Sequence, residues 1–237
     1  MNFQPATSGT IRFSPMPRKA FEGSPASKTF LVSVGTTQKV MPGKTLFAEG
    51  DDADTVFEIV QGILKLYKLL PDGRRQIMGF VSTDKLIGFS DEETYEYTAE
   101  ALTEVSLCRY SRAQFNRLLD EMPGFARRVL NGRSQDLHSA QDQMLLLGRK
   151  TAMERIASFL LSFGKLQQKP SNSASLHLPM SRADIADYLG LTIETVSRTL
   201  TKLKNDSIIS LPEAVEIKLI DRHRLEELAA GETLEAA

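Results

Sequence analysis

Residues 181–204 read SRADIADYLGLTIETVSRTLTKLK, and this stretch predicts the fold of the second half of the chain. Ser181 followed three residues later by Asp184 is a capping box, which predicts that a helix begins there. Gly190 predicts the end of that helix, because glycine takes a left-handed conformation without steric cost. Thr192 can cap a second helix. Two short helices joined by a glycine turn predict a helix-turn-helix.

The outer face of the predicted second helix carries Glu194, Ser197 and Arg198 at spacings of three and four residues. Arginine can donate two hydrogen bonds to guanine, glutamate can accept one from cytosine, and serine can approach thymine closely. We therefore predict that these three side chains read bases. The alternative is a solvated helix face with an ordinary Glu–Arg pair. The residues predicted to contact DNA phosphates are Ser181, Arg182, Thr192, Thr195, Thr199, Lys202 and Lys204.

Two short alternating runs follow at 208–211 and 215–219, separated by residues 212–214. They predict a β-hairpin, which would extend the motif to a winged helix-turn-helix domain over residues 149–220. Within that domain the polar segment 165–177 is interpreted as a loop. Residues 221–237 are interpreted as an acidic C-terminal tail or short helix.

The first half of the chain has a different pattern. Residues 1–30 are rich in proline, serine and glycine, which is typical of a flexible arm. Over residues 31–115, short alternating runs are broken about every ten residues by turn signals, which predicts a β-roll or barrel. The turn signals include Gly43, Gly50, Gly62, Gly73 and Gly79.

A helical pattern then covers residues 116–148. Apolar positions alternate at spacings of three and four, as in the seam of a helix pair, which predicts dimerisation along this helix. Packing on its own domain is the alternative, and a polar Arg133 in the seam would help to fix the register. The predicted interface residues are Leu130, Arg133, Leu137, Ala140, Met144 and Leu147.

Charge is divided unevenly along a chain whose net charge is −1. Residues 34–110 carry 8 Lys and Arg against 13 Asp and Glu, whereas residues 149–206 carry 9 against 5. The basic second half suits a nucleic-acid partner. Cys108 is the only cysteine, so a disulfide framework is excluded. Its thiol is either buried and inert or, if exposed, a redox sensor.

No apolar run approaches the roughly 18 residues that cross a bilayer, and no secretory signal is apparent. We therefore expect a cytoplasmic protein with no membrane contact. An enzyme is not expected either, because His138, His177 and His223 lie far apart and no phosphate-binding loop or nucleophile elbow occurs. A catalytic cupin would need metal-binding histidines, and the β-roll region has none, so no metal site is predicted.

Taken together, these features resemble the CRP/FNR superfamily of bacterial transcription regulators, from about Val34 to Leu219. The resemblance is carried by Phe47–Asp51, Gly62, Gly73 and Leu86–Gly88 in the β-roll, by the long helix, and by Glu194–Arg198. It implies an α+β fold with an N-terminal β-roll like the cyclic-nucleotide-binding jelly roll, a long dimerisation helix and a C-terminal winged helix-turn-helix.

The E-x-x-S-R pattern is similar to the FNR and FixK branches, which recognise a TTGA-type inverted repeat. By this resemblance Arg198 would read the guanine, Glu194 its complementary cytosine or a neighbouring base, and Ser197 the thymines. The expected partners are double-stranded DNA, a second copy of the chain and RNA polymerase, and the expected role is that of an activator.

Two departures from the family bear on regulation. The N-terminal arm has none of the cysteines that hold the iron–sulfur cluster of the FNR branch. Gly88-Phe89 and Tyr97-Thr98 stand where cyclic-nucleotide binders place Gly-Glu and Arg-Ser, and the acidic residues 91–93 would repel a phosphate. We therefore expect a FixK-like regulator without cofactor or effector. The alternative is an effector-gated regulator whose β-roll binds haem or another small molecule.

Overall fold

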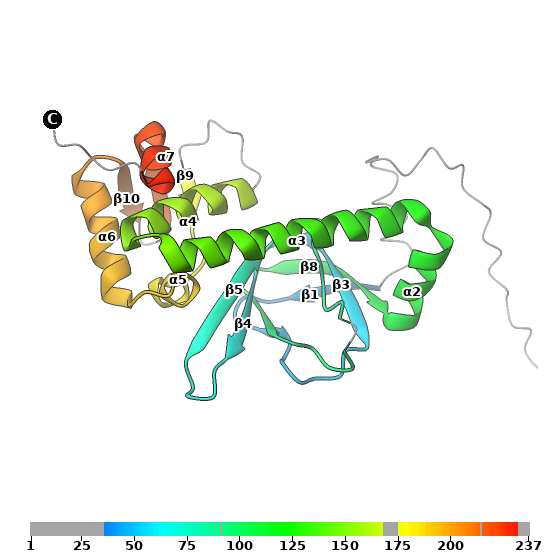
Figure 1. Ribbon diagram of the computed structural model, residues 1–237. Helices are drawn as coiled ribbons and strands as arrows, with labels where there is room; N and C mark the ends of the chain where they lie inside the picture. The colour runs from blue at the N-terminus through cyan, green and yellow to red at the C-terminus, as the bar shows by residue number, and fades with distance from the viewer. Residues whose placement is uncertain (1–35, 91, 168–174, 214, 232–237) are drawn as a thin grey trace, which may run out of the picture.

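The computed structural model describes residues 36–90, 92–167, 175–213 and 215–231. A β-roll and a C-terminal domain lie along one long helix, α3 (Pro123–Arg149), which crosses the molecule (Figure 1). This is the expected α+β architecture. The predicted arm, residues 1–30, and the last six residues of the predicted tail lie outside the described residues.

The β-roll consists of two four-stranded antiparallel sheets, ordered β1-β8-β3-β6 and β2-β7-β4-β5. Ile59, Leu64 and Leu107 are fully buried between the sheets, as the alternating pattern requires. The strands are β1 (Thr36–Val40), β2 (Thr45–Phe47), β3 (Thr55–Gln61), β4 (Leu64–Leu69), β5 (Arg75–Val81), β6 (Leu86–Ile87), β7 (Thr98–Ala101) and β8 (Val105–Ser111).

Four of the five predicted glycine turns are confirmed by positive φ angles, at Gly43, Gly50, Gly62 and Gly73. A Cβ atom at Gly62 would lie 2.4 Å from the carbonyl oxygen of Glu104, so only glycine fits there. The prediction for Gly79 was wrong. It lies inside β5, opposite Leu66, next to a register shift in the β4–β5 ladder. Glycine inside a strand often marks such a bulge.

The helical region that follows the β-roll is divided, which differs from the single predicted helix over 116–148. Helix α2 (Arg112–Glu121) begins directly after β8, and Met122 then separates it from α3. Pro123 occupies the first turn of α3, where its missing N–H is not needed. The β-roll therefore ends at Ser111, four residues before the predicted boundary.

The C-terminal domain contains a three-stranded sheet ordered β10-β11-β9 and four helices among the described residues. Its elements are α4 (Ala152–Leu166), β9 (Ser175–His177), α5 (Arg182–Leu189), α6 (Ile193–Asn205), β10 (Ile209–Glu213), β11 (Glu216–Leu219) and α7 (Arg222–Ala230). The predicted β-hairpin is thus confirmed as β10 and β11. None of the helices in the described ranges is both long and apolar enough to span a membrane.

Two predictions for this domain need correction. The segment 165–177 is not all loop, because α4 continues to Leu166 and residues 175–177 form β9, which pairs with β11. The segment after 220 forms the short helix that was one of the two alternatives, but it belongs to the domain, because α7 packs against α4 and buries Leu225 and Leu228 in the domain core. Spacing of three residues places these two leucines on one face of α7.

Candidate DNA-binding site

The first helix of the motif, α5, begins at the predicted capping box. The hydroxyl of Ser181 accepts a hydrogen bond from the Asp184 amide at 3.0 Å, and the Asp184 carboxylate accepts one from the Ser181 amide at 3.1 Å. Gly190 ends the helix at φ 61°, ψ 42°, in the left-handed region. The sequence prediction of helix, glycine turn and second helix is therefore confirmed.

The position of the second helix, α6, is fixed by a cap at its N-terminus and by a buried apolar face. The Thr192 hydroxyl accepts a hydrogen bond from the Thr195 amide at 3.2 Å and so caps the helix. Val196, Leu200 and Leu203 are buried in the domain core, as their spacing predicted. Because one face of α6 is buried in the core, the opposite face is exposed to solvent.

That solvent face presents the three predicted base-reading side chains. Glu194, Ser197 and Arg198 are all exposed. Hydrogen bonds from its own backbone and from Thr192 hold the pKa of Glu194 below its usual value, and the charge of Arg198 acts in the same direction. An ionised carboxylate beside a guanidinium gives this face both an acceptor and a bidentate donor, which are the groups that read cytosine and guanine.

The residues predicted to contact phosphates differ in their exposure to solvent. Thr192, Lys202 and Lys204 are exposed, and Thr195 is half-buried. Thr199 is only 9% exposed, so its predicted phosphate contact was wrong. It lies three residues after Val196 and four before Leu203, and these spacings place it on the buried face.

The first turn of α5 holds the other two predicted phosphate residues. Ser181 is exposed, although its hydroxyl already caps the helix. Arg182 is half-buried at the first helical position, and burial lowers the pKa of its guanidinium. The N-terminus of a helix attracts anions, so both residues stand where a phosphate could be received.

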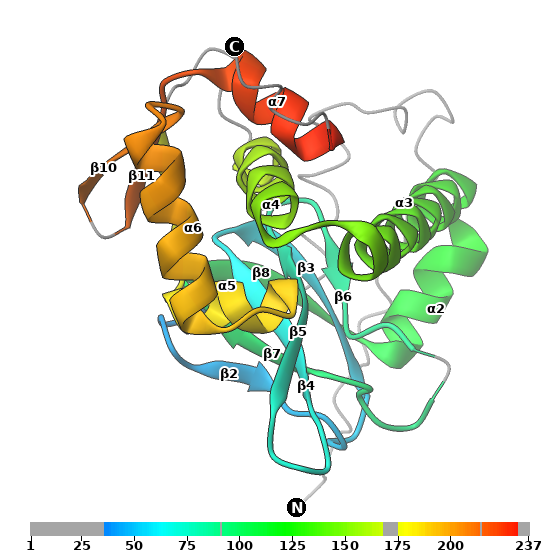
Figure 2. The same ribbon diagram turned by 60° about the vertical axis from the view of Figure 1, so that its left-hand side comes forward.

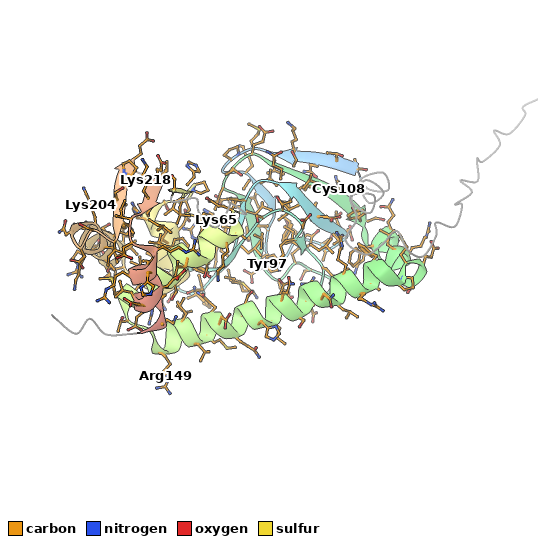
Figure 3. The ribbon with its side chains drawn as sticks, turned by 90° about the horizontal axis from the view of Figure 1, so that it is seen from above. Lys65, Tyr97, Cys108, Arg149, Lys204 and Lys218 are labelled. Carbon is orange, nitrogen blue, oxygen red and sulfur yellow. The ribbon has the colours of Figure 1, made fainter. Side chains whose placement is uncertain are left out.

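Lys218 on the wing was not predicted from the sequence. This lysine is exposed on β11 between the buried Ile217 and Leu219. Figure 3 places Lys204 and Lys218 at the same end of the molecule. The alternation of apolar and polar residues along 216–219 is the signal that could have found it.

Helix α3 carries an exposed apolar stripe, which we define as Leu130, Leu137 and Met144. Their exposed fractions are 70%, 60% and 65%. They lie seven residues apart, so they share one face of the helix. Ala140 is exposed beside the stripe, and so is Leu145, which the sequence analysis missed.

The other two predicted interface residues contact their own chain instead. The Arg133 guanidinium lies 4.8 Å from the centre of the Phe89 ring and donates to the Phe89 carbonyl at 2.9 Å. Leu147 packs against the core of the C-terminal domain. Both lie on the same edge of the predicted seam, and packing against their own chain covers that edge at these two positions.

The β-roll is joined to α5 by a charged and aromatic contact, which we call the interdomain latch, formed by Lys65, Arg75, Phe80, Asp184 and Asp187. Lys65 on β4 and Arg75 on β5 pair with Asp184 at 3.1 and 2.7 Å. Arg75 also pairs with Asp187 at 2.7 Å. Figure 2 shows α5 lying beside β5.

The aromatic part of the latch is Phe80 on β5. Its ring lies within 6.0 Å of the rings of Phe159 and Phe163 on α4 and of Tyr188 on α5. Burial alone would raise the pKa of Asp184. Hydrogen bonds from Ser181 and Lys65 outweigh burial and hold the pKa of this carboxyl below its ordinary value of 3.8. The latch therefore contains an ionised carboxylate.

Comparison with known proteins agrees with this geometry. A family model described as a Crp-like helix-turn-helix domain matches residues 154–228, and one described as a cyclic nucleotide-binding domain matches residues 37–122. The nitrogen fixation regulation protein FixK of Bradyrhizobium diazoefficiens is 43% identical over 190 residues, which is 80% of each chain. The chain belongs to the CRP/FNR family of transcription regulators.

Other relatives place this CRP/FNR regulator near the FixK branch. The transcriptional activatory protein AadR of Rhodopseudomonas palustris is 42% identical over 192 residues, 80% of each chain. The solved structure of FixK2 from Bradyrhizobium japonicum has a TM-score of 0.75 and 37% identity, covering 86% of this chain and all of that one. These relatives are transcription regulators and not enzymes, in agreement with the sequence analysis.

The interior of the CRP/FNR regulator's β-roll contains a cluster of packed aromatic rings. The Phe47 ring stacks on Tyr95 with centroids 3.9 Å apart and lies 5.7 Å from Phe57 and 5.6 Å from Tyr97. The Tyr97 hydroxyl accepts a hydrogen bond from the Gly88 amide at 3.2 Å. Gly88 and Tyr97 are the positions that correspond, by family resemblance, to the phosphate-binding residues of cyclic-nucleotide binders.

Cys108 lies buried on β8. Burial raises the pKa of its thiol, and the nearby Glu58 carboxylate raises it further. A buried thiol with a raised pKa holds little thiolate at neutral pH, which favours the inert role over redox sensing. Within the described ranges, no three His, Cys, Asp or Glu side chains are grouped so that they could hold a metal ion.

Proposed function

We propose that this regulator binds DNA as a homodimer and recognises a TTGA-type inverted repeat through Glu194, Ser197 and Arg198. The observation that carries the proposal is the exposure of these three side chains on one face of α6, whose opposite face is buried. The exposed stripe on α3 pairs two copies, so that two recognition helices enter successive major grooves about 34 Å apart.

The proposal includes activation of transcription in the cytoplasm, with the bound dimer contacting RNA polymerase. The names of the relatives support this role, since AadR is a transcriptional activatory protein and FnrL of Cereibacter sphaeroides, 36% identical, is a transcriptional activator protein. The basic second half of the chain, with exposed Lys202 and Lys204, supplies the positive charge that phosphate contacts need.

We further propose that no small-molecule effector is required. Two features support this. The Phe47 ring packs on Tyr95 and Tyr97 inside the β-roll, and the interdomain latch already holds α5 against the β-roll. A regulator gated by haem or a small molecule is the alternative, and it predicts weak DNA binding until the molecule is supplied.

The test is Arg198→Ala, measured by fluorescence anisotropy on a TTGA inverted repeat and on the same duplex with the guanines replaced. Loss of a bidentate contact should weaken binding to the repeat by about 1–3 kcal/mol, or about 5- to 150-fold. Binding to the altered duplex should hardly change. Arg149→Ala is the matched control, because Arg149 is an exposed arginine at the end of α3. Unchanged base preference in Arg198→Ala would contradict the proposal.

A further inference from the structure

Arg155, in the first turn of α4, is bound to the ends of two other helices. Its guanidinium donates to the carbonyls of Leu147 at 2.9 Å and Lys150 at 2.9 Å, which close α3. It also donates to the carbonyl of Leu189 at 2.8 Å and, more distantly, to that of Gly190 at 3.4 Å, which close α5. One side chain therefore joins three helices.

The acceptors are well matched to a guanidinium. The last carbonyls of a helix have no partner within the helix, and they form the negative end of its dipole. The planar fork of arginine can satisfy several such carbonyls at fixed angles, whereas lysine offers only a point charge. Arg155 therefore fixes the directions of α3 and α5 relative to each other as well as holding them together.

Two further contacts bring the C-terminal half of α3 close to the end of α5. Gln143 on α3 donates to the Tyr188 carbonyl at 2.8 Å. A Cβ atom at Gly190 would lie 3.4 Å from a methyl group of Leu147, so α3 approaches the glycine turn directly. By contrast, the covalent connection between α3 and α4 is only Lys150 and Thr151, both extended. Such a short non-helical link does not by itself set an angle.

We infer that Arg155 is a positioning residue that sets the spacing between the two half-sites the dimer accepts. This inference rests on the proposed function. The stripe on α3 fixes where the second copy lies, and α5 and α6 carry the surface that contacts DNA. Because Arg155 bridges α3 and the α5–α6 turn, the angle it holds determines how far apart the two recognition helices stand.

The experiment compares the full-length protein with Arg155→Ala and Arg155→Lys on inverted repeats whose half-sites are separated by the preferred spacer or by one or two base pairs more or fewer. The preference of the unaltered protein for one spacer should fall by about tenfold in Arg155→Ala, since at least one hydrogen bond to a charged group is lost. Arg155→Lys should be intermediate. Discrimination at the guanine should stay unchanged in both variants.

Arg149→Ala is the control, because Figure 3 shows this arginine pointing away from the molecule at the end of α3. It should keep the spacer preference. If Arg155→Ala and Arg155→Lys both keep it, the inference is overturned. It is also overturned if spacer preference and guanine discrimination fall together, since that would mean general damage to the fold. If the unaltered protein has no spacer preference, the proposed dimeric function itself fails.

Discussion

The interior of the β-roll and the outer face of α6 differ in what their side chains contact. In the β-roll, the Phe47 ring packs on the rings of Tyr95 and Tyr97. On α6, Glu194 and Arg198 stand exposed on a helix whose other face is buried. The first arrangement stabilises a domain, and the second offers hydrogen-bonding groups to a partner. In the proposed function the β-roll therefore serves as a support, and binding is concentrated in the C-terminal domain and on α3.

Leu137→Glu should have the largest effect, because it tests whether binding needs two copies. A charge in the middle of the exposed stripe should dissociate the dimer. The affinity for the inverted repeat should then fall by about 10²–10⁴, because the two half-site contacts are no longer linked. Sedimentation equilibrium and anisotropy would measure both quantities. The matched control is Leu69→Glu, because Leu69 is 61% exposed on β4 and Leu137 is 60% exposed. A dimeric, tightly binding Leu137→Glu protein would rule out the stripe as the interface.

Phe47→Ala tests whether the β-roll interior contributes only to stability. Removing a buried aromatic ring should lower the free energy of unfolding by about 3–5 kcal/mol. Where the protein is folded, its ratio of affinities for repeat and scrambled duplexes should stay the same. Urea unfolding and anisotropy at low temperature would test this. A change in that ratio would mean that the β-roll interior takes part in recognition.

Asp184→Asn tests the interdomain latch through pH. The depressed pKa of Asp184 means that its ionised form contributes stability that is fully present above 3.8 and is lost as pH falls through the folded-state pKa. The asparagine variant should be less stable at pH 7 by about 1–3 kcal/mol, because Lys65 and Arg75 lose a charged partner. Its stability should also decline less steeply in acid.

Urea unfolding at a series of pH values would measure this difference. The control is Glu104→Gln, because Glu104 forms an exposed ion pair with Lys39 at 2.8 Å that should contribute little. Parallel acid profiles for the unaltered protein and Asp184→Asn would show that folding does not lower the pKa of Asp184.

Lys202→Ala should have the smallest effect. Loss of one phosphate contact should weaken repeat and scrambled duplexes alike and reduce the slope of log affinity against log salt by about one per protomer. Anisotropy titrations at several salt concentrations would measure the slope. A loss confined to the repeat would assign Lys202 to base reading instead.

Local signals predicted much of this fold. The capping box at Ser181, the turn at Gly190 and the inward positions of α6 depend on neighbours within a few residues, and the structure confirms each of them. The hydroxyl of Thr199 suggested a phosphate contact, whereas its spacing from Val196 and Leu203 places it on the buried face of α6.

Contacts between the domains could not be predicted from a single sequence. Nothing near Asp184 indicates that Lys65, more than a hundred residues away, is its partner. The four carbonyls that Arg155 binds likewise meet only after the helices have packed. The turn of Arg133 and Leu147 toward their own chain follows from the same packing and not from the heptad pattern.

In the proposed function, the β-roll supports DNA binding without an effector. The most direct measurement is an anisotropy titration of purified protein, freed of metals and small molecules by unfolding, dialysis and refolding, against a TTGA inverted repeat and a scrambled duplex. Tight binding to the repeat, with affinity at least about 10³-fold above that for the scrambled duplex, is the predicted result. Equal, weak binding to both duplexes that becomes selective only when a cell extract's small-molecule fraction is restored would contradict the claim.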